Sequence, residues 1–145
     1  MHRALVASVA LATLSCGNGE PSPTRPACLS AVDTEQCSPL YPPEFPELFT
    51  AVFSQTCASG GGTCHGPTGR QGGLVFADEN EAYDLLLGQQ GNKTRVIPGD
   101  AACSELIVRL DSAGEPWSMP PGAPLSEGAR CSIRRWIALG APRGQ

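Results

Sequence analysis

Seven cysteines in a chain of 145 residues are the feature that most constrains what this sequence can fold into. The chain also contains 17 glycines and 14 prolines, so a small domain built from it has little apolar material for a core. Small exported domains of this kind depend on disulfides or on a bound cofactor for their stability. The bonds that the cysteines form therefore determine which folds are open to the chain. The cysteines stand at positions 16, 28, 37, 57, 64, 103 and 131.

The N-terminus predicts export. His2 and Arg3 precede a short apolar run that ends in small residues, which is the layout of a secretory signal. The run is shorter than the roughly 20 apolar residues that span a bilayer. Thr13-Leu14-Ser15-Cys16 resembles a bacterial lipobox, which predicts a signal peptide over residues 1–15 and a lipid on Cys16. We therefore expect a membrane-anchored protein on the periplasmic or outer-surface side. Cleavage after Ala12, which would release a soluble protein, is the alternative.

Composition divides the rest of the chain in two. Residues 16–45 are rich in proline and polar side chains, which predicts a semi-extended tether. Residues 46–142 have the length of one small domain. The formal net charge is −4 and no basic block occurs, which excludes nucleic acid as a partner and leaves a lipid anchor as the expected contact with a membrane.

Apolar periodicity predicts four helices in this domain. The first covers residues 47–56, and the second covers residues 79–87 and ends at Gly88. The third is capped by Asp100, and the last begins near Ser126 and ends before residue 140. Long loops rich in glycine and proline separate them. The expected fold is a small all-α domain.

The remaining chemistry lies in two loops. Cys64-His65 follows a run of glycines, and Met119 lies in a loop with prolines after it. The only other histidine and methionine, His2 and Met1, fall in the predicted signal. Covalent attachment of haem needs two thiols and an imidazole, usually as Cys-x-x-Cys-His, and a methionine often supplies the second iron ligand.

A series of motifs accompanies this pair in a fixed order. The series runs Cys64-His65-Gly66, Gly72-Gly73-Leu74, Val96-Ile97-Pro98-Gly99-Asp100, Ser104 with Leu106, Met119-Pro120-Pro121-Gly122, and Arg135-Trp136-Ile137-Ala138-Leu139-Gly140-Ala141. In this order the chain resembles small cytochrome c domains of the planctomycete and myxobacterial type. The resemblance implies a cytochrome c-like fold with a covalent haem c, a thioether at Cys64, and His65 and Met119 as ligands of the haem iron.

The spacing of the first cysteine departs from that family. Cys57 precedes Cys64 by seven positions, giving Cys-x6-Cys-His. A bulged glycine loop would still bring Cys57 to the haem as a second thioether, or the haem would be held by Cys64 alone. Two haem-free interpretations stay open, namely a Cys57–Cys64 disulfide and a zinc site that adds His65 but lacks a fourth ligand.

The resemblance implies electron transfer with redox proteins as partners. We expect no enzymatic activity, because no catalytic set of side chains is recognisable. The alternative function is that of a haem-free lipoprotein domain, stabilised by disulfides, that acts as a binding or structural module.

Six cysteines remain once Cys16 is assigned to the lipid, and an even number in an oxidising compartment predicts disulfides. We expect Cys103 to pair with Cys131, where their two helices meet, and Cys28 to pair with Cys37 within the tether. The alternative is a bond from Cys57 to Cys103 or to Cys131.

Overall fold

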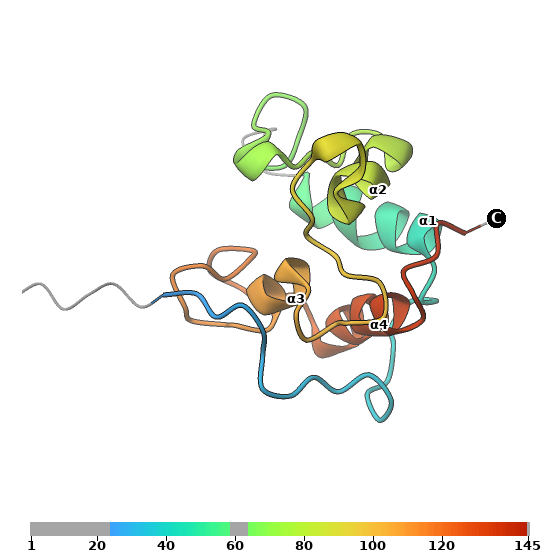
Figure 1. Ribbon diagram of the computed structural model, residues 1–145, viewed down its shortest axis with the longest axis vertical. Coiled ribbons are helices and arrows are strands. Elements are labelled where there is room, and N and C mark those ends of the chain that lie inside the picture. The colour runs from blue at the N-terminus through green and yellow to red at the C-terminus, as the bar shows by residue number, and fades with distance from the viewer. Residues whose placement is uncertain (1–23, 59–63, 145) are drawn as a thin grey trace, which may run out of the picture.

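The structure, a computed structural model, describes residues 24–58 and 64–144, in which short helices are joined by long loops (Figure 1). Those residues contain no strand, which confirms the all-α class. The predicted signal peptide and Cys16 lie outside the described residues. In chain order the elements are α1 (Phe45–Leu48), η1 (Phe49–Cys57), η2 (Gln71–Gly73), α2 (Glu79–Leu87), η3 (Gln89–Gly91), α3 (Glu105–Leu110) and α4 (Glu127–Ala138).

The first predicted helix is present, but its geometry differs from an ordinary α-helix. It starts at Phe45, with Pro46 in the first turn, and α1 passes directly into η1, which is a π-helix. The N–H of Ala58 donates to the carbonyl of Phe53, five residues back, at 3.0 Å. Such wide turns are rare and are often found at functional sites. The last turn of η1 carries Cys57.

The second and fourth helices confirm the sequence prediction, because their ends are set by local capping. The Asp78 carboxylate accepts from the N–H of Glu81 at the start of α2, and Gly88 ends that helix with a φ of 70°. The Ser126 hydroxyl accepts from the N–H of Ala129 at the start of α4.

The third helix begins later than predicted. The Asp100 carboxylate accepts from the N–H of Cys103 at 3.0 Å, but it caps a turn, and α3 starts only after Ser104. Cys103 therefore lies outside the helix, and it does not form part of the apolar face of α3. This placement directs it to a different disulfide partner from the predicted one.

Aromatic packing forms the core between η1, α4 and the segment after His65. The rings of Phe53 and Phe76 stack with centroids 4.9 Å apart, and Phe45 and Trp136 lie 5.3 Å apart. Trp136 is fully buried and its Nε1–H donates to the carbonyl of Pro142. Phe76 and the two residues before it are buried without forming a strand. This core supports one side of the cavity described below.

The predicted pairing of the cysteines is wrong. The structure joins Cys28 to Cys103 and Cys37 to Cys131, over sequence separations of 75 and 94 residues. We call residues 24–44 the N-terminal strap, because they run along α3 and α4 without forming a helix (Figure 1). Cys103 and Cys131 each face the strap, so neither is available to the other.

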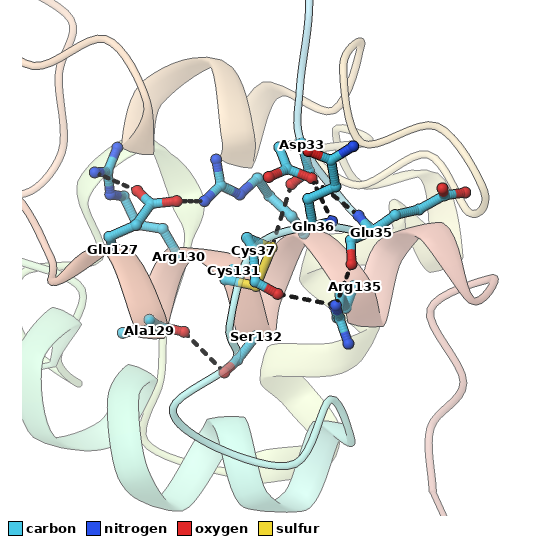
Figure 2. Close-up of a disulfide and its surroundings, with 12 residues drawn as sticks. Asp33, Glu35, Gln36, Cys37, Glu127, Ala129, Arg130, Cys131, Ser132 and Arg135 are labelled. Atoms are coloured by element: carbon cyan, nitrogen blue, oxygen red, sulfur yellow. Dashed lines mark hydrogen bonds and ion pairs between the residues drawn. A yellow bond between two sulfur atoms is a disulfide. The ribbon is translucent and has the colours of Figure 1, made fainter.

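Hydrogen bonds fix the strap between its two disulfides and beyond them. The N–H of Leu29 donates to the carbonyl of Ala102 at 2.9 Å, and the N–H of Tyr41 donates to the Ser132 hydroxyl at 2.9 Å. Figure 2 shows the Cys37–Cys131 disulfide on α4, with the guanidinium of Arg135 donating to the carbonyl of Cys37 at 2.9 Å. The described part of the proline-rich segment is therefore fastened to the helices and is not a free tether.

Candidate functional site

One cavity of about 440 Å³ brings together all four residues that the sequence assigned to the haem site. Cavities of about 300 to 1,000 Å³ are the usual size for small-molecule and cofactor sites. The four residues are Cys57, Cys64, His65 and Met119. The other lining residues are Thr56, Gln71, Gly72, Leu74, Phe76, Lys93, Arg95, Glu105, Leu106, Arg109, Leu110, Pro120 and Pro121. Apart from its charged members, this lining is largely aliphatic, aromatic or proline.

The four candidate haem residues come from three separate parts of the chain. Cys57 ends η1, while Cys64 and His65 lie in the segment that follows it. Met119 lies in the loop between α3 and α4, where its N–H donates to the carbonyl of Arg109 at 2.9 Å. Only the folded chain brings these parts to one cavity.

The unusual spacing between the two cysteines does not separate them from the histidine. The N–H of His65 donates to the carbonyl of Cys57 at 3.2 Å, so the histidine lies beside the first cysteine. Cys57 and Cys64 are both free thiols, the first partly buried and the second exposed. The structure therefore contains neither a Cys57–Cys64 disulfide nor a bond from Cys57 to Cys103 or Cys131.

Hydrogen bonding orients the His65 ring. Its Nδ1 lies 3.3 Å from the carbonyl of Leu74, and the ring stands edge-on to Phe76. Because a carbonyl only accepts, this contact places the proton on Nδ1 and the lone pair of the neutral ring on Nε2. Ligating histidines in proteins are usually held in this way by the second ring nitrogen.

Burial also favours the form of His65 that binds metals. It lowers the pKa of the imidazole, and this effect outweighs the hydrogen bonds to the carbonyls of Leu74 and Gln71, which act in the opposite direction. A lower pKa keeps the ring neutral over a wider pH range. Neutral imidazole is the ligand form.

The Cys57 thiol is protonated at neutral pH. Burial, with a smaller contribution from Cys64, raises its pKa to about 12. Because the thiolate is the form that attacks disulfides, a thiol with this pKa exchanges slowly. The environment of Cys57 thus favours its remaining reduced beside two intact disulfides.

Charged side chains also line the cavity, and no sequence motif marks them. Glu105 lies at their centre, with its carboxylate 2.6 Å from Lys93 and 3.0 Å from Arg109. Burial opposes ionisation of Glu105, but the hydrogen bonds from these two cations outweigh it, and the pKa of the carboxyl is lowered. Arg95 also lines the cavity and is almost fully buried.

The donor set does not match a conventional metal site made only of protein side chains. Among the described residues, no three or more His, Cys, Asp and Glu side chains come close enough to hold a metal ion. The zinc interpretation of Cys57, Cys64 and His65 therefore has no support. Within residues 24–58 and 64–144, no helix has the length and apolar character needed to cross a membrane.

Comparison with known proteins gives one match. Residues 62–122 match the family model described as planctomycete cytochrome C, which supports a cytochrome c domain family for this chain. The matched stretch contains Cys64, His65 and Met119 and begins after Cys57. No curated protein and no solved structure matches the chain.

Proposed function

From the family match over residues 62–122, we propose that this protein carries electrons as a c-type cytochrome with one covalently bound haem. The observation that carries the proposal is the single cavity lined by His65, Met119 and two free thiols. Met119 is far in the sequence from Cys57, Cys64 and His65, and an ordinary packing role gives no reason for it to meet them.

The residues present fit a haem. His65 has its lone pair on Nε2 and Met119 offers a thioether sulfur, so these two residues would hold the iron. Cys64 would form one thioether and Cys57 a second, since the backbone bond from His65 to Cys57 keeps both thiols at the cavity. When bound, the haem supplies one-electron oxidation and reduction of its iron.

The chain would set the properties of that iron through its own side chains. The apolar side chains of Leu74, Phe76, Leu106 and Leu110 line the cavity and would limit the access of water to a bound haem. An apolar surrounding and methionine ligation both favour the reduced iron, which carries less charge, and both raise the reduction potential.

The proposal predicts a specific loss in a Met119→Ala variant. Wild-type protein made in a host with cytochrome c maturation machinery is expected to show a Soret band, together with a methionine–iron charge-transfer band near the red end of the spectrum. Met119→Ala should retain the Soret band and lose the charge-transfer band, because alanine has no sulfur. Ser118→Ala, its neighbour, is the matched control and should retain both. An unchanged spectrum in Met119→Ala would mean that another group is the second ligand.

We propose also that the protein is exported and anchored through a lipid on Cys16. The lipobox-like Thr13-Leu14-Ser15-Cys16 supports this assignment. Cys16→Ser is expected to move the protein from the membrane fraction to the soluble fraction, since a lipid chain is what holds it. Wild-type protein found already in the soluble fraction would instead favour cleavage after Ala12.

A second candidate function is supported by the disulfides. Two bonds fasten the strap across α3 and α4 without involving the cavity, so they would stabilise the domain with or without a haem. In this alternative the protein is a haem-free lipoprotein domain that acts as a binding or structural module. Colourless, folded protein from a host that loads a control cytochrome would favour it.

A further inference from the structure

The charged side chains of the cavity wall do not balance one another. The lining contains three cations, Lys93, Arg95 and Arg109, and one carboxylate, Glu105, which leaves a net charge of +2. Burying charge in an apolar surrounding is unfavourable unless an opposite charge accompanies it, and Arg95 is the buried cation among the three. The wall therefore favours an occupant that carries negative charge.

Glu105 already forms ion pairs with three cations, so its single negative charge does not neutralise the lining. Its side chain is 12% exposed and contacts Lys93 and Arg109 within the lining. It also contacts Arg25 of the strap at 3.3 Å, outside the lining. With three cations around one carboxylate, Glu105 holds Lys93 and Arg109 in place without neutralising the wall.

Arg95 is the least compensated of these cations. Its guanidinium donates to the carbonyls of Leu85 and Lys93, both at 2.8 Å, and to the carbonyl of Gly72. These neutral partners use three of its five N–H groups. Among the described residues no carboxylate lies within ion-pair distance of Arg95, although its side chain is buried.

We propose that Lys93, Arg95 and Arg109 bind the two carboxylates of the haem, and that Glu105 is the positioning residue that holds this cationic wall in place. The inference rests on the proposed function. It adds which residues of the cavity bind the carboxylates of the haem. A ring with two carboxylates carries a charge of −2, which matches the net charge of the lining. Guanidinium groups also suit carboxylates in geometry.

Opposite shifts in the reduction potential test the proposal. A cation near the iron favours the reduced state and an anion favours the oxidised state. At pH 8, Arg95→Gln should lower the equilibrium constant for reduction by about tenfold, and Glu105→Gln should raise it by a similar factor, from Coulomb's law at an effective dielectric constant of about 20. Arg143→Gln is the matched control, since Arg143 pairs with Asp84 away from the cavity and should leave the potential unchanged.

The pH dependence adds a second readout. In Arg95→Gln the haem carboxylates lose one of the three proposed cations, so the pKa of a carboxylate should rise and the reduction potential should climb as the pH falls from 8 to 5. The other charged groups facing it are Lys93, Arg109 and Glu105. The lowered pKa of Glu105 keeps that carboxyl ionised over this range, so wild-type protein should show a flat profile.

The outcomes separate this inference from the proposed function. Each variant is first checked for covalent haem by staining after denaturation. If wild type contains no haem, the proposed function and the inference both fail. If haem is bound but potentials and pH profiles match the control, only the carboxylate assignment is overturned. The Lys93 side chain is 57% exposed, so Lys93→Gln should lower the reduction potential less than Arg95→Gln does. If Arg95→Gln does not fold, the potential of Lys93→Gln tests the carboxylate assignment in its place.

Discussion

Replacing His65 with alanine is expected to reduce covalently bound haem to less than about a tenth of the wild-type amount. The imidazole lies at the cavity with its lone pair on Nε2, held by the contact from Nδ1 to the carbonyl of Leu74. Alanine removes the iron ligand, which is also the histidine of the haem attachment motif. Haem staining of denatured protein, normalised to the amount of chain, measures the effect.

Pro67→Ala is the matched control for His65→Ala. Pro67 lies two residues further along the same segment, is exposed and does not line the cavity. It should retain the wild-type haem content. Full haem content with an unaltered spectrum in His65→Ala would show that the histidine is a surface loop residue.

Removing the Cys37–Cys131 disulfide is expected to cause the largest loss of stability. The chain-entropy account gives about 4 to 5 kcal/mol for a loop closed over 94 residues, whereas small domains have only about 5 to 15 kcal/mol in total. The Cys37→Ala/Cys131→Ala double variant should therefore melt more than about 10 °C below wild type. Thermal unfolding followed by far-UV circular dichroism measures the difference.

Two comparisons give this experiment its controls. Gln36→Ala changes an exposed neighbour of Cys37 and should melt within about 1 °C of wild type. The Cys28→Ala/Cys103→Ala variant removes the other bond of the strap and should also be destabilised. A double variant at Cys37 and Cys131 that melts with the wild type would contradict a stabilising role for the strap.

Sequence predicted the helices best where their ends depend on neighbouring residues. α2 and α4 begin at Asp78 and Ser126, whose side chains accept from backbone N–H groups three residues on. α3 misled the prediction because Asp100 satisfies the same capping pattern in a turn. The π geometry of η1 has no recognised signature in residue types, because its apolar spacing also fits an α-helix.

Long-range pairings are the part of the fold that the sequence did not specify. Four cysteines allow three pairings, and the predicted one assumed a free tether before residue 46. The strap instead lies along α3 and α4, where Leu29 forms a hydrogen bond with Ala102 in the turn before α3 and Tyr41 forms one with Ser132 of α4. Proline and polar composition indicates that a segment is extended, but it does not indicate whether the segment is packed.

The candidate site was predicted in its motif residues and missed in its charged ones. Cys64, His65 and Met119 were found because the resemblance depends on their order, and the structure places them at one cavity with Cys57. Lys93, Arg95, Glu105 and Arg109 belong to no motif, and single charged residues usually lie on solvated surfaces. Their shared cavity wall follows from tertiary packing.

The mass of the intact mature protein, followed by the mass of the peptide that contains Cys57 and Cys64, tests the central claim most directly. Protein from a host with cytochrome c maturation machinery is expected to be heavier than its chain by one haem. That haem should remain on this peptide after denaturation and reduction of the disulfides. A chain without haem, in which the same peptide contains a Cys57–Cys64 disulfide, would contradict electron transfer by a c-type haem in this protein.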